Sequence, residues 1–306
     1  MKKHLLLFFF LLLFISPHCF AGDSIPYIKA KGVRSSHLAR SGKAFNLYDM
    51  VISGFDPTSG DTLNIRVHFF ENKKSGKLPL LIIVPPINGV SMRERNVSDH
   101  FIRCGYHTVV IEPVRNISDT LVPIRDFENR LLCFVSAVRS TLDIFENSEH
   151  VDPKNMFVWA ASLGAIYSSY AVCVDKRINA AVLALGGAPL ADIVTDSRQE
   201  YVVRYRNDRM QEEHLSSTEA FRQKMKENMH IDVLKLAKNR AASDLYFIVS
   251  LNDKSVPTRY QLMLADAFGP GSTIRKYRKG HGKVLIESHT FHLNNYSDFL
   301  NSKIRH

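Results

Sequence analysis

Cysteine is scarce in this chain, with four in 306 residues. Cys19 lies in the N-terminal segment, which leaves Cys104, Cys133 and Cys173 for the rest of the chain. An odd number allows at most one internal disulfide, and because all three lie in apolar or helical stretches, buried thiols are an equally good prediction. No Cys-x-x-Cys or Cys/His spacing typical of a zinc site occurs.

Long apolar runs are missing after the N-terminal segment, and no later stretch approaches the eighteen residues of a spanning helix. At the N-terminus, a short basic start precedes the apolar run Leu5–Ile15, and Cys19 and Ala21 place small residues before a cleavage site. We therefore expect residues 1–21 to be a secretory signal peptide and the protein to be secreted or periplasmic. An uncleaved membrane anchor is the alternative.

Internal repeats and a Pro/Ser/Gly-rich linker are also missing, so residues 22–306 are expected to form one domain. With 45% hydrophobic and 23% charged residues, a disordered chain is excluded. Strands and helices alternate along most of the sequence, which predicts an α/β fold: a doubly wound, mostly parallel β-sheet with helices on both faces.

The predicted strands share apolar or alternating character. They are Ala44–Ser53, Thr62–Glu71, Leu78–Val84, Thr108–Glu112, Asn155–Ala160, Ile178–Leu185, Asp244–Ser250 and Ser272–Lys279. The main predicted helices cover Arg93–Arg103, Ile124–Phe145, about 164–173 and Arg259–Ala267.

A highly charged segment, Arg198–Arg240, interrupts this alternation. Phe221, Met225 and Met229 form one narrow apolar stripe within it, which indicates helices lying over the sheet edge. We expect a helical cap at about 190–240, whose apolar stripe either lines an acyl pocket or packs the cap against the domain.

Ser162 stands between a predicted buried strand and a helix, with Ala160 and Gly164 two residues away on either side. A serine that projects from a sharp strand-to-helix turn needs small neighbours at those positions. At the N-terminus of the helix, the dipole favours developing negative charge, and the Leu163 N–H is free to bind an oxyanion. Ser162 is therefore the candidate nucleophile.

This segment resembles the nucleophile elbow of the α/β-hydrolase superfamily, Gly-x-Ser-x-Gly, with Ala160 in place of the first glycine. The resemblance covers about 44–304 and implies an acid after a later strand and a histidine after the last one. Asp253, in an Asp-x-x-Val-Pro segment, and His281, in a Gly-His pair, match those positions. The resemblance implies a serine hydrolase with an α/β-hydrolase fold.

The superfamily's oxyanion loop follows a central strand, which here is Leu80–Val84. Pro85 and Pro86 come next and have no N–H, so Ile87 is the first available donor and Asn88 the second.

Other acids and histidines are alternatives. Asp192 could replace Asp253, although capping the insertion suits it better. If 283–287 were extended, His289 would follow the last strand instead of His281, and His292 is a third candidate. His289 and His292 have the spacing of a metal pair on a helix, but without a third ligand they are better interpreted as surface histidines.

The chemistry of the trio requires no metal or cofactor. An imidazole removes the serine proton during attack and returns it to the leaving group, and a carboxylate orients the imidazole. The resemblance implies a carboxylic ester as substrate, either a small molecule or a lipid, cleaved by an esterase or lipase. A peptidase or thioesterase of the same fold is the first alternative, and a non-catalytic binding protein that keeps the fold is the second.

The formal charge is +10, and removal of Lys2 and Lys3 with the signal peptide would leave +8. The basic stretch Arg275–Lys279 is expected on an edge strand, where positive charges discourage pairing between sheets, so we predict no nucleic-acid partner. Attraction to an anionic membrane surface stays open as a peripheral contact.

Overall fold

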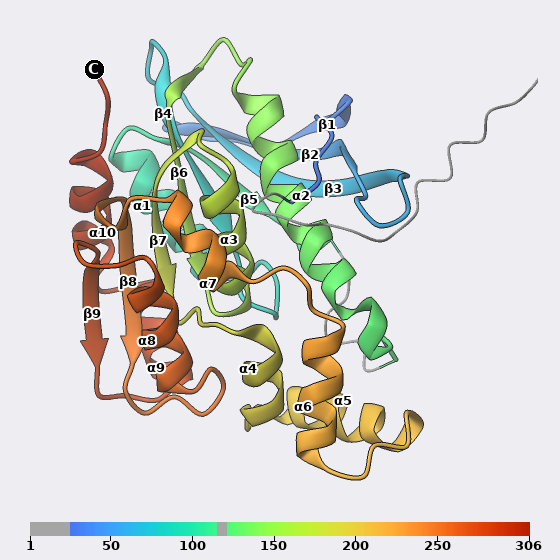
Figure 1. The fold of residues 1–306 in the computed structure, drawn as a ribbon. Coiled ribbons are helices and arrows are strands. Elements are labelled where there is room, and N and C mark those ends of the chain that lie inside the picture. The colour runs from blue at the N-terminus through green and yellow to red at the C-terminus, as the bar shows by residue number, and fades with distance from the viewer. Residues whose placement is uncertain (1–24, 115–120) are drawn as a thin grey trace, which may run out of the picture.

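The computed structural model describes residues 25–114 and 121–306. Figure 1 shows a central sheet with helices packed on both sides of it. The predicted signal peptide, 1–21, lies outside the described residues. Within these two ranges, no helix combines the length and the apolar character needed to cross a membrane.

One sheet, in the order β1-β2-β3-β5-β4-β6-β7-β8-β9, contains the nine strands of the described residues. Their bounds are β1 Gly32–Ser41, β2 Phe45–Phe55, β3 Thr62–Asn72, β4 Leu78–Val84, β5 His107–Ile111, β6 Val151–Ala161, β7 Ile178–Ala184, β8 Leu245–Ser250 and β9 Thr273–Tyr277. The pairs β1–β2, β2–β3 and β3–β5 are antiparallel, whereas all pairs from β5 to β9 are parallel. This confirms the predicted mostly parallel α/β sheet.

The strand β1 was not predicted from the sequence. It pairs with β2 along its length, but nine of its ten residues are exposed, so it has no alternation of apolar and polar residues to reveal it. At the other edge of the sheet lies β9, which carries Arg275 and Lys276 of the basic stretch that was expected on an edge strand, while Arg278 and Lys279 follow it.

Two apolar layers hold the helices against the sheet. On one face pack α1 Met92–Arg103, α9 His281–Ser288 and α10 Leu293–Asn301, and on the other α2 Phe127–Phe145, α3 Leu163–Val174 and α8 Thr258–Ala267. In β4, Leu81 and Ile83 face the first layer, whereas Leu80 and Ile82 face the second. A strand covered on both faces must be apolar at every position, which is why β4 shows no alternation.

Four α-helices lie between β7 and β8 in the predicted cap segment: α4 Leu190–Asp196, α5 Glu200–Glu212, α6 Thr218–Glu227 and α7 Val233–Leu236. Figure 1 shows α4, α5 and α6 at the end of the molecule toward which β8 and β9 run. Phe221 and Met225 are fully buried, and Phe221 packs against Tyr205 with ring centroids 6.4 Å apart. This contact of the α6 stripe lies within the cap, between α5 and α6, and it holds these two helices together.

Asp196, at the end of α4, connects the cap to the main domain. Its carboxylate accepts hydrogen bonds from Arg222 of α6 and from Arg259 and Tyr260 of α8. Burial raises the pKa of this carboxyl, but the hydrogen bonds from these three side chains outweigh it and lower the pKa to about 2.

We expect the stability that Asp196 provides to be lost in acid. Because its pKa in the folded protein lies below the ordinary 3.8, the contribution is complete at neutral pH and disappears as the pH falls through 2. Asp196→Asn should lower the free energy of unfolding by about 1–2 kcal/mol at pH 7. The effect is kept to this size because the contacts of Asp196 are partly exposed to solvent, which screens the charges. Urea unfolding from pH 7 downward should show this difference shrinking below pH 4, whereas a constant difference would contradict the assignment. Asp266→Asn, at an exposed position of α8, is the matched control.

The three cysteines form no disulfide within the described residues. Cys133 and Cys173 are buried as expected, and burial raises the pKa of the Cys173 thiol to about 12. Cys104 is exposed, contrary to the prediction, because it follows the last turn of α1 at the molecular surface.

Candidate active site

Ser162 occupies a strained turn between β6 and α3. Its backbone has φ 53° and ψ −121°, a conformation that a non-glycine residue adopts only where the surrounding structure enforces it. The Ser162 N–H donates to the carbonyl of Ala184 on β7, at 2.7 Å. A Cβ atom on Gly164 would lie 2.4 Å from the Pro85 carbonyl oxygen and 2.5 Å from that of Val84. The glycine is therefore required because the turn packs directly on the end of β4.

The structure brings Ser162, His281 and Asp253 into one hydrogen-bonded chain. Ser162 Oγ lies 2.9 Å from His281 Nε2, and His281 Nδ1 lies 2.7 Å from Asp253 Oδ2. The three residues follow β6, β9 and β8, whose carboxyl ends meet at one edge of the sheet. The Asp253 side chain is fully buried, and 14% of the His281 side chain is exposed. Since a carboxylate only accepts, Nδ1 carries the proton and Nε2 is left to accept one from the serine.

The Asp253 carboxylate is fixed from several sides. Its Oδ1 accepts hydrogen bonds from the N–H groups of Ser255 and Val256, at 2.8 and 3.0 Å. Its Oδ2 accepts one from the Gln261 side chain at 2.8 Å, in addition to the contact with His281. These bonds keep a buried charge satisfied and aim one oxygen at the imidazole.

Gln261 was not predicted as a site residue. This side chain on α8 is 1% exposed, donates to Val256 O at 2.7 Å and accepts from Ser250 N at 3.0 Å. It therefore joins the end of β8 to the loop that carries Asp253. The signal in the sequence is a polar residue on the buried face of a predicted amphipathic helix, which by itself does not identify the partner.

Replacing Gln261 with leucine should loosen Asp253 without touching the substrate. We expect kcat to fall by about 10- to 100-fold with little change in KM, because a misplaced base affects the transition state more than binding. Unpairing Ser250 N–H should also lower the free energy of unfolding by about 1–3 kcal/mol. Steady-state kinetics and urea unfolding measure both, with Gln223→Leu on the exposed face of α6 as the control. An unchanged kcat would contradict the positioning role and would show that Gln261 only stabilises the fold.

The two predicted oxyanion donors lie beside the serine. Leu163 is the first residue of α3, so its N–H has no acceptor within the helix. Ile87 follows Pro85 and Pro86 in a turn that is closed by a 2.9 Å hydrogen bond from Gly89 N to Pro86 O. Leu163 and Ile87 both line the same pocket as Ser162. Asn88, the alternative donor, lines a neighbouring polar pocket instead.

The alternative acid and histidines lie in other surroundings. Asp192 accepts a hydrogen bond from Arg222 at 2.7 Å and forms an ion pair with Lys226 at 3.1 Å, both inside the cap. Residues 283–287 are helical within α9, so β9 is the last strand and His281 is the histidine that follows it. His292 is the residue preceding α10, with its ring 5.3 Å from that of Tyr277.

His289 is not a surface histidine, contrary to the prediction. It is completely buried, its Nε2 lies 3.3 Å from Glu94 Oε1, and its ring forms a T-shaped pair with Trp159, with ring centroids 4.5 Å apart. Burial raises the pKa of Glu94, but hydrogen bonds from His289 and Ser91 outweigh it and lower that pKa. The prediction rested on the lack of a third metal ligand, which does not bear on burial, whereas His289 is the C-cap residue of α9 and packs against Trp159 of the sheet.

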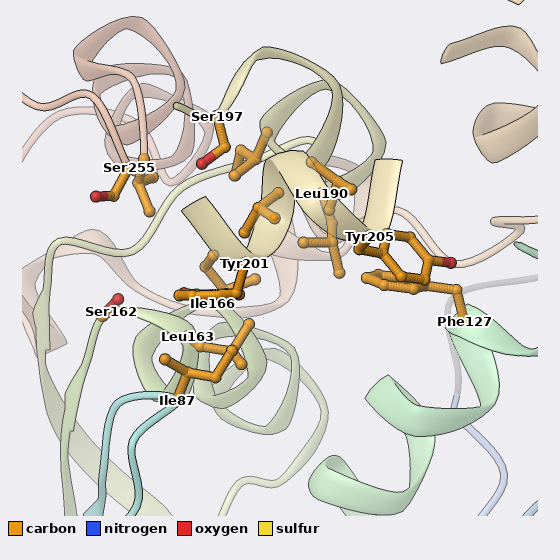
Figure 2. A pocket seen from close by; sticks show the side chains of 14 residues that line it. Ile87, Phe127, Ser162, Leu163, Ile166, Leu190, Ser197, Tyr201, Tyr205 and Ser255 are labelled. Atoms are coloured by element: carbon orange, nitrogen blue, oxygen red, sulfur yellow. The ribbon is translucent and has the colours of Figure 1, made fainter. Parts of the chain in front are cut away.

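An apolar pocket of about 600 Å³, counting the part open to solvent, extends from Ser162 between α3 and the cap. Figure 2 shows Ser162 at one end and the rings of Phe127 and Tyr205 at the other. The residues lining it are Ile87, Phe127, Ser162, Leu163, Ile166, Leu190, Ile193, Val194, Ser197, Tyr201, Val202, Tyr205, Ser255 and Val256. Burial here raises the pKa of Tyr201 to about 12, so its hydroxyl stays neutral.

Within the described residues, no group of three or more His, Cys, Asp or Glu side chains is arranged to hold a metal ion.

Comparison with known proteins identifies the fold. Acetyl xylan esterase from Paenibacillus sp. R4 superposes with a TM-score of 0.64 at 18% identity, over 88% of each chain. A cold-adapted esterase from an Arctic intertidal metagenomic library superposes with a TM-score of 0.59 at 14% sequence identity, over 89% of this chain and all of the esterase. Pyrococcus horikoshii acylaminoacyl peptidase superposes with a TM-score of 0.60 at 16% sequence identity, over 86% of this chain and 42% of the peptidase.

These likenesses show that the chain has the α/β-hydrolase fold, as the sequence resemblance implied. No protein-family model matches the sequence, and the search of curated proteins also finds no match. Because one fold carries many chemistries, the activity must be argued from the site.

Proposed function

We propose that this protein is a secreted serine hydrolase that cleaves carboxylic esters through an acyl-enzyme formed on Ser162. The observation that carries the proposal is the chain of hydrogen bonds from Ser162 through His281 to Asp253, at 2.9 and 2.7 Å. It is supported by the strained serine turn and by two N–H groups beside it. Secretion rests on the signal-peptide pattern of residues 1–21 alone.

In the proposed mechanism, Ser162 Oγ attacks the ester carbonyl carbon while His281 Nε2 takes its proton. The N–H groups of Leu163 and Ile87 stabilise the oxyanion of the tetrahedral intermediate. His281 then protonates the departing alkoxide, which leaves an acyl group on Ser162. Water enters, is deprotonated by His281 and releases the acid. Throughout, Asp253 holds the imidazole tautomer and stabilises the imidazolium.

The apolar pocket favours an ester over a peptide substrate, because a peptide chain needs hydrogen-bonding partners that these walls provide poorly. A peptidase is nevertheless the second candidate, since acylaminoacyl peptidase shares the fold. A thioesterase uses the same attack and differs only in the leaving group.

The test is a comparison of kcat/KM on p-nitrophenyl esters, acyl-coenzyme A thioesters and peptidyl p-nitroanilides. We expect the esters to be cleaved fastest. Faster cleavage of the anilides would indicate a peptidase, and faster cleavage of the thioesters would indicate a thioesterase. If no substrate is turned over and no fluorophosphonate reacts, the proposal fails and a non-catalytic binding protein is favoured.

A further inference from the structure

We infer that the pocket between α3 and the cap holds the acyl chain of the ester, and that the rings of Phe127 and Tyr205 limit it to alkanoyl chains of medium length. This inference rests on the proposed function and specifies its substrate class. Three observations carry it: the position of the pocket relative to His281, the chemistry of its walls, and the pair of packed rings at its far end.

The position of the pocket identifies which half of the ester enters it. Ser162 and both expected oxyanion donors, Leu163 and Ile87, contribute to its wall, but His281 is not among the residues that line it. The leaving oxygen must receive its proton from His281 Nε2, so the alcohol half departs on the histidine side. The acyl half therefore extends away from His281 and into the pocket.

The walls indicate an alkyl chain. The fourteen described residues that line the pocket include no charged side chain. Its three serines, Ser162, Ser197 and Ser255, lie toward one end in Figure 2. Beyond them the labelled side chains are hydrophobic or aromatic, from Ile166 and Leu190 to Tyr205. A carbonyl group at the polar end with an alkyl tail in the apolar part matches this gradient, whereas a sugar in the pocket would leave its hydroxyls unpaired.

The far end sets the length limit. Phe127, the first residue of α2, and Tyr205 of α5 face each other there with ring centroids 5.4 Å apart. Both are almost fully buried, at 8% and 6% exposed, so the rings are held in place by their surroundings. An acyl chain that reaches these rings cannot be longer without displacing one of them. The free-energy cost of that displacement exceeds the free energy gained by burying one more methylene.

The test is the dependence of kcat/KM on acyl length across the p-nitrophenyl esters of acetate, butyrate, hexanoate, octanoate, laurate and palmitate. Each methylene buried in the pocket should raise kcat/KM by about fourfold. We expect a rise from acetate to a maximum at hexanoate or octanoate, followed by a steep fall at laurate and palmitate.

Two neighbouring valines of α5 give a matched pair of variants. Val202 lines the pocket, whereas Val203 is not among the lining residues, and both are half-buried. Val202→Phe should fill the pocket and lower the ratio of hexanoate to acetate hydrolysis at least tenfold. Val203→Phe should leave the chain-length profile unchanged. Phe127→Ala should open the far end and move the maximum of kcat/KM toward laurate.

The outcomes separate this inference from the function on which it rests. Ester hydrolysis with a maximum at acetate, or the same profile in Val202→Phe and Val203→Phe, overturns the acyl pocket and leaves the serine esterase in place. Failure to hydrolyse any ester removes the esterase and the acyl pocket together.

Discussion

Substituting Ser162 with alanine should reduce kcat for ester hydrolysis by about 10⁶-fold, because the members of such a trio act as a unit and the nucleophile has no substitute. The fold should survive, because alanine removes only one oxygen. The turn itself is held by the backbone hydrogen bond to Ala184 and by the packing of Gly164, and neither contact involves that oxygen. Residual hydrolysis should come only from the oxyanion donors and from binding. Kinetics with a p-nitrophenyl ester measure the loss.

Ser168→Ala is the matched control. Ser168 lies on the same helix, α3, is fully buried and has no hydrogen-bond partner for its hydroxyl among the described residues. The same atom is removed in both variants, so a change in helix packing would affect both. We expect Ser168→Ala to keep the wild-type kcat. Comparable losses in the two variants would show that the effect comes from α3 and not from a nucleophile.

His281→Ala should reduce kcat by at least about 10⁴-fold, because Ser162 would lose its general base and the alkoxide its proton donor. The substrate pocket should be unaffected, since His281 does not line it, so KM should change little. Asp253 would also lose the partner at 2.7 Å, although its three other hydrogen bonds remain.

The other C-terminal histidines serve as comparisons. His292→Ala, beside Tyr277, should keep full activity. His289→Gln should keep kcat for the folded protein but unfold at lower urea concentration, because Glu94 would be left in a buried site with a weaker partner. A full loss of kcat in either variant, with His281→Ala still active, would overturn the assignment of His281.

The sequence predicts eight of the nine strands in the described residues, and it names the three residues that the structure joins by hydrogen bonds. Strands such as β4 are covered on both faces and are therefore apolar throughout, and the small residues around Ser162 are needed by the turn that carries it. The order of the serine, the acid and the histidine along the chain follows the order of the strands that they terminate. The strand pattern and the turn at Ser162 are local signals, so a single sequence displays them, whereas Asp253 and His281 were assigned from the resemblance to the α/β-hydrolase superfamily.

The features that were missed depend on contacts between distant segments. The strand β1 is stabilised by pairing with β2, although most of its side chains are exposed. Gln261 is functionally placed only because α8 packs against the loop of Asp253. His289 is polar in sequence but buried by its position against Glu94 and Trp159. The pocket likewise combines α2, α3, α4 and α5, which no local pattern brings together.

The most direct test of the proposed nucleophile is covalent labelling of the purified protein with a fluorophosphonate, followed by mass spectrometry of its peptides. Only a serine activated by a neighbouring base reacts readily with such a reagent. We predict one phosphonylated site, on the peptide that contains Ser162, and no labelling of Ser162→Ala. Labelling that persists in Ser162→Ala, or a label on a different serine, would contradict the assignment of Ser162 as the nucleophile.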